Sequence, residues 1–241
     1  MNLVIDIGNN FFKLGIFQNS NLIFSCSDKN LKINNELEKI LTKYKELKNV
    51  LISNVSSVKI SHLTEKYNIT TFELNASFNF PFKLAYQTPE TLGNDRLALA
   101  AAATIKYPNS NNLIIDAGTC ITIDLINSNN IFMGGSISPG IKMRYDSLNH
   151  YTANLPLLSL GKNFNFPGES TNNSIHSGVI GGLLNEITGF IDKINSRYDN
   201  INVILTGGDA KFLSKTLKIA IFANQNFILE GLNGILNLNK D

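Results

Sequence analysis

Two stretches of the chain share one pattern of apolar and polar positions. In residues 2–17, NLVIDIGNNFFKLGIF, an apolar run leads into an acidic turn, after which Phe12, Leu14 and Ile16 alternate with residues of the opposite face. This alternation around a Gly-Asn pair predicts a β-hairpin whose turn contains Gly8-Asn9. The same plan recurs in residues 112–126, NLIIDAGTCITIDLI, which predicts a second hairpin.

The remaining apolar runs predict further strands and helices. Short runs rich in β-branched and aromatic residues indicate strands within residues 22–27, 49–55, 70–75, 129–137 and 201–206. Helical spacing or alanine-rich composition indicates helices within residues 34–49, 56–67 and 170–198, a helix headed by Asp95, one that begins at Pro139, and one after Gly208. The expected caps are Asn34 or Asn35 for the first helix and Ser138 for the helix that begins at Pro139.

The two acidic turns mark the starts of two similarly built halves, with a boundary within residues 108–112. An internal duplication is the simplest account, although similarity over so few residues can also arise by chance. Duplication predicts an α/β fold of two lobes, residues 1–109 and 110–241, which face each other across a cleft. We expect one acidic turn from each lobe to point into that cleft.

Composition narrows the class of protein. The 241 residues are 43% hydrophobic, and 21 basic and 19 acidic side chains give a net charge of +2. Because this balance comes without a Lys/Arg-rich block, it predicts no binding of nucleic acid or of an anionic membrane. Cys26 and Cys120 match no zinc spacing, and the sequence shows no signal segment or membrane span, so we expect a cytoplasmic protein.

The two turns suit the binding of a nucleoside triphosphate. Main-chain N–H groups of a Gly-rich turn can hold a phosphate, and a neighbouring carboxylate can hold Mg²⁺ or a monovalent cation that bridges to the phosphates. Asp6 precedes residues 8–9, and Asp116 precedes residues 118–119. For one copy, an ordinary turn after a strand is the simpler interpretation. Two matched copies, together with LTGG at residues 205–208, favour nucleotide binding.

Other phosphate-binding motifs do not fit. No G-x-G-x-x-G follows a predicted strand. GGSISPGIK, residues 134–142, has Ile141 where the lysine of a Walker loop should follow Gly140, and no Ser or Thr follows Lys142.

Five motifs, in order, resemble those of the type III pantothenate kinases. They are DIGNN, TLGNDR, DAGTCITIDL, GGSISPG and LTGGDA, and the resemblance extends from Asn2 to about Leu213. That family belongs to the superfamily of acetate and sugar kinases, heat-shock ATPases and actin. The resemblance therefore implies two duplicated ribonuclease-H-like lobes. It also implies a homodimer whose substrate pocket lies near the interface between subunits.

The resemblance implies a role for each matched position. Asp95 would be the general base, Asp116 would bind a monovalent cation, and Asp6 would hold Mg²⁺ through the phosphates. ATP would contact Asp6, Ile7, Gly8, Asn9, Asn10, Phe11, Phe12, Lys13, Thr119, Gly207 and Gly208. Pantothenate would contact Tyr86, Gly93, Asn94, Asp95, Arg96 and Thr171.

The chain departs from the family's pattern at two of these motifs. Asn10 replaces the usual Thr and keeps a hydrogen-bonding side chain, and Cys120 replaces the more frequent Ala. Neither change removes a charged catalytic group, so both affect the expected affinity more than the expected activity.

Several candidate residues also have structural alternatives. Asp95 could cap the alanine-rich helix, and Arg96 could be an exposed residue of that helix. Asp124, on the strand after the second turn, could support a bound cation or be an ordinary neighbour of that turn without a role in binding. The glycines of residues 177–182 are expected to allow close helix packing rather than to bind a ligand. The histidines share no metal-ligand spacing and are expected to be structural or solvent-facing: His62, His150 and His176.

The sequence thus predicts ATP-dependent phosphorylation of pantothenate to 4′-phosphopantothenate, the first step of coenzyme A biosynthesis. The expected cofactors are ATP, Mg²⁺ and K⁺ or NH₄⁺. One alternative is another enzyme on the same lobes, such as a sugar kinase or a polyphosphate-type phosphatase, and the TLGNDR stretch argues against it. The other is a non-catalytic relative that acts as an accessory factor in transcription, against which the retained Asp6, Asp95 and Asp116 argue.

Overall fold

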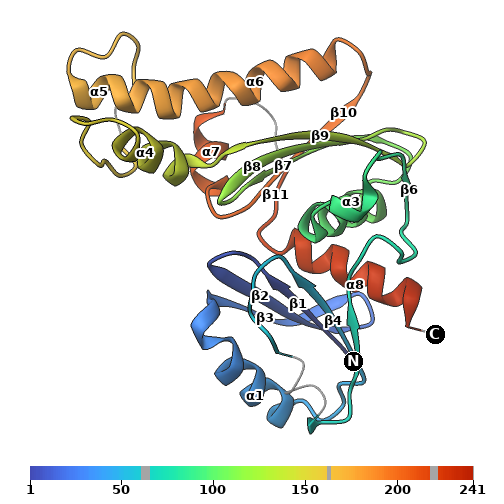
Figure 1. Cartoon of the computed structure of the whole chain (residues 1–241). Coiled ribbons are helices and arrows are strands. Elements are labelled where there is room, and N and C mark those ends of the chain that lie inside the picture. Colours follow the sequence, from blue (N-terminus) through green and yellow to red (C-terminus); the bar gives the residue numbers. More distant parts are fainter. Residues whose placement is uncertain (61–65, 162–163, 218–221, 241) are drawn as a thin grey trace. The chain divides into compact units, whose positions relative to one another are not determined.

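The computed structural model describes residues 1–60, 66–161, 164–217 and 222–240 (Figure 1). Its contacts divide the chain into two compact units. The first consists of Met1–Asn109, Ser128–Met133 and Asn226–Asp241, and the second of Ser110–Asn127 and Gly134–Gln225. Each unit combines strands of a central sheet with helices.

The sheet of the first unit has the strand order β3-β2-β1-β4-β5. Its strands are β1 (Asn2–Ile7), β2 (Phe11–Gln18), β3 (Asn21–Lys29), β4 (Asn49–Asn54) and β5 (Thr70–Glu73). β1 and β2 form the first predicted hairpin, which is confirmed, and β1, β4 and β5 run parallel. The carboxyl ends of these three strands therefore share one edge of the sheet, called here the β1–β4–β5 edge.

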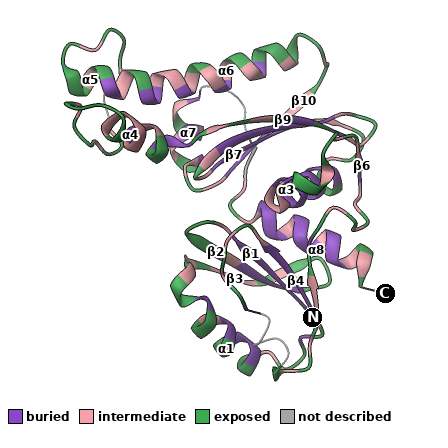
Figure 2. Ribbon diagram, in the orientation of Figure 1, coloured by how far each residue is buried: buried purple, intermediate pink, exposed green. Residues whose placement is uncertain are grey.

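Helices cover both faces of this sheet. α1 (Ile33–Lys43) follows a short 3-10 turn, η1 (Asn30–Lys32), and packs on the face that carries Leu3, Ile5 and Ile7. α8 (Phe227–Asn239) contacts β1, β2 and β4 and packs along α3 (Asn94–Lys106). Figure 2 shows how much of α3 and α8 is buried. Because both faces are covered, β2 is buried over most of its length.

The second sheet has the strand order β11-β10-β7-β8-β9-β6. Its strands are β6 (Lys83–Leu84), β7 (Asn111–Ala117), β8 (Cys120–Ile126), β9 (Ile131–Pro139), β10 (Ile201–Thr206) and β11 (Phe222–Ala223). β7 and β8 form the second predicted hairpin, and β7, β10 and β11 run parallel. β6 pairs with the first residues of β9, and both of these segments belong to the first unit.

The helices of the second unit pack around one apolar cluster. They are α4 (Ile141–His150), α5 (Thr171–His176), α6 (Gly182–Asn195) and α7 (Ala210–Thr216). The first unit also contains a 3-10 turn, η2 (Pro89–Thr91), which precedes α3. A π-helical turn, η3 (Ser177–Gly181), joins α5 to α6, so the predicted long helical segment is confirmed. None of the helices in the described ranges is long and apolar enough to cross a membrane.

The two sheets repeat one plan. The order β3-β2-β1-β4-β5 of the first corresponds strand by strand to β9-β8-β7-β10-β11 of the second. In each, a hairpin is followed by a third strand, helical segments and a strand parallel to the first strand of the hairpin. The predicted α/β fold with two similarly built halves is therefore confirmed.

Three local predictions need correction. α1 begins after Lys32, so Asn34 and Asn35 lie inside the helix and do not cap it. Strand β9 continues to Pro139, and Gly140 is the N-cap of α4, so Ser138 is not a cap. The helix predicted for residues 56–67 does not include residues 56–60, residues 61–65, which include His62, lie outside the described part, and Lys66 is helical.

The C-terminal segment also differs from the expected organisation. The division expected between residues 109 and 110 would assign α8 to the second half. In the structure α8 packs against α3 and β1, and the contacts group it with the first unit. Local sequence patterns do not reveal this return, because an apolar helix can pack on either sheet.

Candidate active site

Asp6 lies at the β1–β4–β5 edge, directly before the end of β1. It stands opposite Lys13 on β2 and Ser53 on β4. Ser53 Oγ donates a hydrogen bond of 3.0 Å to Asp6 Oδ1. Ile5 and Ile7 on either side are fully buried beneath α1. Since side chains alternate along a strand, Asp6 points to the other face, where its carboxylate is half-buried.

The first turn connects β1 to β2 through residues 8–10. Gly8 N donates to Phe11 O at 3.0 Å and closes the hairpin. Asn30, which follows β3, donates hydrogen bonds to carbonyl oxygens of this turn. Asn9 and Asn10 are exposed, so the turn is accessible to a ligand.

Not every side chain of the predicted ATP-binding stretch, residues 6–13, is available to a ligand. Ile7 and Phe12 are 0% exposed and belong to the hydrophobic core. They can therefore offer only main-chain atoms. Phe11, in contrast, is 56% exposed, and Lys13 is half-buried.

The start of α3 lies at the same edge as Asp6. Asn94 Nδ2 donates to Leu74 O, directly after β5, at 2.9 Å. Leu74 N in turn donates to Ile52 O on β4 at 2.8 Å. Gly93–Arg96 is therefore fixed to the β1–β4–β5 edge, where residues 74–76 and 89–94 line a hollow of about 450 Å³.

Asp95 is the second residue of α3. The N-cap is Gly93, so the alternative that Asp95 caps the helix is wrong. Asp95 Oδ1 accepts a hydrogen bond of 2.8 Å from Arg96 N, and the positive end of the helix dipole favours a carboxylate at this position. A Cβ atom at Gly93 would collide with Asp95 Oδ1. Glycine is therefore required there for this orientation of the carboxylate.

Arg96 is buried rather than exposed on the helix surface. Only 5% of it is accessible. Its Cζ lies 5.5 Å from the ring centroid of Tyr86 and 5.8 Å from that of Phe132. Aromatic faces at these distances attract a guanidinium group and fix its plane. The structure thus brings two predicted substrate residues, Tyr86 and Arg96, into contact.

Asp116 occupies in the second sheet the position that Asp6 has in the first. It lies on β7 opposite Thr122 on β8 and Thr206 on β10, and like Asp6 it is half-buried. Thr206 Oγ1 donates to Asn224 O at 2.9 Å. The corresponding Ser53 donates instead to its neighbouring aspartate.

The second turn is held by main-chain hydrogen bonds. Gly118 N donates to Cys120 O, and Gly140 N donates to Thr119 O, both at 3.0 Å. A Cβ atom at Gly140 would collide with the carbonyl oxygens of Gly118 and Thr119. The end of β9 therefore packs directly on the turn, and the Thr119 side chain is exposed.

The Gly-Gly pair after β10 packs against Asp116. Gly207 has a φ of +95°, and a Cβ atom on it would collide with Asp116 Oδ1 and Ala117 O. Asp209 N donates to Ala117 O at 2.9 Å. Gly208 is exposed, and a Cβ atom added to it would have no other atom within 4 Å. The predicted residues 116 and 207 thus lie side by side.

A cavity of about 500 Å³ adjoins this pair in the second unit. It is lined by Asp209, by α4 residues that include Ile141 and Tyr145, and by the apolar segment 157–160. Burial raises the pKa of the Asp209 carboxyl. The cavity thus combines an apolar wall with the carboxyl groups of Asp146 and Asp209 and the ammonium group of Lys142 at its lining.

Thr171 is the first residue of α5 and is exposed. The N-cap, Ser170, accepts a hydrogen bond of 3.2 Å from Asn173 N. Thr171 belongs to the second unit, whereas the other predicted substrate residues, Tyr86 and Gly93–Arg96, belong to the first.

Four residues that contact the turns, Asp6 or Arg96 were not among the predicted site residues: Asn30, Ser53, Phe132 and Gly140. Three of them reach the site only through strand pairing or packing, for which the sequence holds no local signal. Gly140 lies in the SPG stretch, where the sequence suggested a helix start. In the described residues no group of three or more His, Cys, Asp or Glu side chains is placed to hold a metal ion.

Comparison with known proteins identifies the family. The family model described as "Type III pantothenate kinase" matches residues 2–193. The chain belongs to the type III pantothenate kinase family. A type III pantothenate kinase of Flavobacterium johnsoniae is 45% identical over 97% of this chain and 96% of its own length. The enzyme of Christiangramia forsetii is 44% identical over 100% and 99%.

Solved structures agree with this assignment at the level of the fold. A Campylobacter jejuni protein assigned to the Baf family of transcriptional activators has a TM-score of 0.63 and 27% identity, with 98% of this chain and 97% of that chain covered. A glucokinase from an Antarctic psychrotroph has a TM-score of 0.56 and 11% identity, with 98% of each chain covered. As a member of the type III pantothenate kinase family, the chain is a phosphotransferase, and its actin-like ATPase fold indicates the use of ATP.

Proposed function

We propose that the chain transfers the γ-phosphoryl group of ATP to the 4′-hydroxyl group of pantothenate, which yields 4′-phosphopantothenate and ADP for coenzyme A biosynthesis. The observation that carries the proposal is the place of Gly93–Arg96. This segment, whose motif matches the family's substrate stretch, is tied by Asn94 to the sheet edge at which Asp6 and the first turn lie. Full-length similarity to type III pantothenate kinases supports the same substrate.

In this proposal both turns bind ATP. The main-chain N–H groups of the first turn contact the phosphates, and Lys13 and Thr119 add side-chain contacts. The adenosine group lies against Gly208 and in the cavity beside Asp209, whose apolar lining at residues 157–160 suits a purine ring.

Asp95 orients the nucleophile. Its carboxylate accepts the proton of the 4′-hydroxyl group as the hydroxyl oxygen bonds to the γ-phosphorus and the bond from that phosphorus to the β–γ bridging oxygen breaks. In phosphoryl transfer such a base acts mainly by position. Its hydrogen bond from Arg96 N and the space left by Gly93 supply that position. Arg96, fixed between Tyr86 and Phe132, binds the pantothenate carboxylate or the transferred group.

The residues at Asp116 fit a hard cation. Asp116 Oδ1 and Ala117 O would both be touched by one added Cβ at Gly207, so these two oxygen atoms lie close together. Oxygen donors of this kind are suited to Mg²⁺ and K⁺. We propose that Asp116 holds K⁺ or NH₄⁺ and that Asp6 holds Mg²⁺ through the phosphates. When bound, these cations neutralise charge on the phosphates and the leaving group.

The proposal also includes a homodimer and a cytoplasmic location. Gly178 and Gly182 would accept a Cβ without any contact within 4 Å, so this small-residue face is open for a second subunit near Thr171. Cys26 and Cys120 are free thiols, which suits a reducing compartment. Light scattering of the purified protein tests the dimer.

The test is a kinase assay with the purified chain, pantothenate, ATP, Mg²⁺ and K⁺, with the product identified by mass spectrometry. We expect 4′-phosphopantothenate. Asp95→Asn should lower kcat by about 10²–10⁴-fold, the usual contribution of a general base. Glu46→Gln, which neutralises an exposed carboxylate after α1, is the matched control and should retain activity.

Two results would contradict the proposal. Phosphorylation of a sugar, but not of pantothenate, in a panel of small hydroxyl compounds would indicate another kinase on the same fold. No ATP consumption with any of them would favour the non-catalytic alternative.

A further inference from the structure

The carbonyl oxygens of the first turn are all held by one residue. Asn30 begins η1, next to the turn, because Phe11 pairs with Lys29 at the end of β3. Asn30 Nδ2 donates to Gly8 O at 2.8 Å and to Asn9 O at 3.3 Å, and Asn30 N donates to Asn10 O at 3.0 Å. Three consecutive carbonyl groups therefore point toward Asn30.

The direction of these carbonyl groups fixes the direction of the N–H groups. In a trans peptide the N–H of one residue points opposite to the C=O of the residue before it. The cis peptide bond found in the described residues is Phe166-Pro167, so the bonds of this turn are trans. The N–H groups of residues 9, 10 and 11 consequently face away from Asn30. A row of N–H groups on one side of a turn is the arrangement that binds anions.

The chemistry of the side chain requires an amide. Only the NH₂ group can donate to two carbonyl oxygens at once, so the orientation of the amide is determined. Asn30 Oδ1 is buried and has no hydrogen-bond partner within the described residues. An unpaired buried acceptor is unfavourable, and asparagine at this position therefore stabilises the turn at a local cost.

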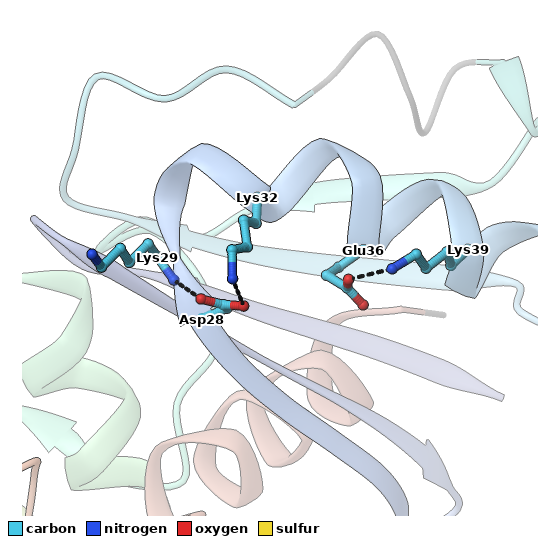
Figure 3. A network of polar contacts seen from close by, with 5 residues as sticks. All are labelled: Asp28, Lys29, Lys32, Glu36 and Lys39. Carbon is cyan, nitrogen blue, oxygen red and sulfur yellow. Dashed lines mark hydrogen bonds and ion pairs between the residues drawn. The ribbon is translucent and has the colours of Figure 1, made fainter.

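The segment that carries Asn30 is itself anchored. Asp28 accepts hydrogen bonds from Lys29 N at 2.7 Å and from Lys32 Nζ at 2.8 Å, one on each side of Asn30 in the sequence (Figure 3). The hydrogen bond from Lys32 lowers the pKa of the Asp28 carboxyl, which favours the ionised form that accepts both bonds. Asn30 thus donates to the turn from a fixed position.

We infer that Asn30 is a positioning residue for phosphate binding. It holds Gly8, Asn9 and Asn10 in the conformation that presents three N–H groups to the phosphates of ATP and keeps the carbonyl oxygens away from them. The inference rests on the proposed function. Asn30 lies outside the five motifs. Its main-chain hydrogen bond to Asn10 O holds residue 10 whatever its side chain, which explains how Asn can replace the family's usual Thr there.

The test compares Asn30→Ala and Asn30→Asp with wild type in steady-state kinetics. Loss of two hydrogen bonds in Asn30→Ala should raise the KM for ATP about tenfold or more, while the KM for pantothenate stays within about twofold of wild type. The nearly isosteric Asn30→Asp should be worse than Asn30→Ala, because its carboxylate would face two carbonyl oxygens. Asn21→Ala and Asn21→Asp, at the exposed start of β3, are the matched controls and should leave both constants unchanged.

A thermal-shift titration with ATP and Mg²⁺ gives the apparent affinity of each variant independently of turnover, and the unfolding midpoint without ligand shows whether it is folded. If Asn30→Asp does not fold, Asn30→Ala, which only removes atoms, carries the comparison. A wild-type affinity of Asn30→Ala for ATP, or equal rises in both KM values, would overturn the inference. If wild type does not phosphorylate pantothenate but Asn30→Ala still binds ATP more weakly than wild type in the titration, only the proposed function would be overturned.

Discussion

The two acidic turns occupy equivalent places in the two sheets but are held by different groups. In both, the residue after the aspartate accepts a main-chain hydrogen bond from the segment after the neighbouring parallel strand: Ile7 O from Val55 N at 3.0 Å, and Ala117 O from Asp209 N at 2.9 Å. Beyond this shared bond the first turn depends on the side chain of Asn30. The second depends on glycines that permit close packing.

This difference shows what duplication preserves. Strand order and register are retained, because they follow from the hydrophobic pattern of each half. The support of each turn has diverged. A side-chain clamp leaves the first turn open, whereas the second turn is packed against Gly140 and its neighbouring aspartate against Gly207. We accordingly expect the first turn to bind phosphate through its main chain and the second to hold a cation through Asp116 and Ala117.

The largest effect is expected for Gly207→Ala, which attacks the support of the second turn. The left-handed backbone alone should cost about 1–2 kcal/mol, and the collision of Cβ with Asp116 Oδ1 adds to it. Urea unfolding measures the loss of stability. Gly208→Ala, where a Cβ meets no atom within 4 Å, is the control and should change the free energy of unfolding by less than about 0.5 kcal/mol. Equal losses in the two variants would show that the second turn does not depend on the space at Gly207.

A smaller effect on the free energy of unfolding is expected for Asp209→Asn. This change keeps the main-chain N–H of residue 209, which donates to Ala117 O, and removes only the charge of the side chain. Burial raises the pKa of this carboxyl in the folded chain, so folding is penalised once the group is ionised. The penalty is absent below the pKa of the unfolded chain, about 3.9, grows as the pH rises above it, and is complete once the pH has passed the folded value. Asp209→Asn should therefore be more stable than wild type at pH 7, and the difference should shrink toward pH 4.

Urea unfolding of both proteins between pH 4 and 7 tests this sign. A variant that is less stable than wild type at neutral pH would show that the charge of Asp209 stabilises the fold, and a difference that does not change with pH would show that its ionisation is irrelevant.

Much of the fold could be predicted from the sequence because its signals are local. The alternation around Gly8 and Gly118 specifies two hairpins, and the alanine-rich composition after Asp95 specifies α3. Of the residues proposed to carry the chemistry, Asp6 and Asp116 could be singled out from the local pattern, since each lies at the end of a strand before a Gly-containing turn. The role proposed for Asp95 came from the resemblance of TLGNDR to the family's motif.

The contacts that support those residues could not be predicted, because they join segments far apart in the sequence. Asn30 reaches Gly8 only through the register of β2 and β3, and Phe132 meets Arg96 only because β9 passes beside α3. The error at Pro139 has a similar cause. A proline after a serine is typical of a helix start, but β9 continues two residues beyond the predicted strand, to Pro139, and the helix begins after Gly140.

The measurement that tests the division of work between the two turns most directly is the rate of pantothenate phosphorylation as a function of K⁺ concentration, in Asp116→Asn and Asn30→Ala. We predict that Asp116→Asn loses activation by K⁺ or needs at least about tenfold more of it. Asn30→Ala should keep the wild-type K⁺ requirement and need more ATP. The same K⁺ dependence in Asp116→Asn as in wild type would contradict the account.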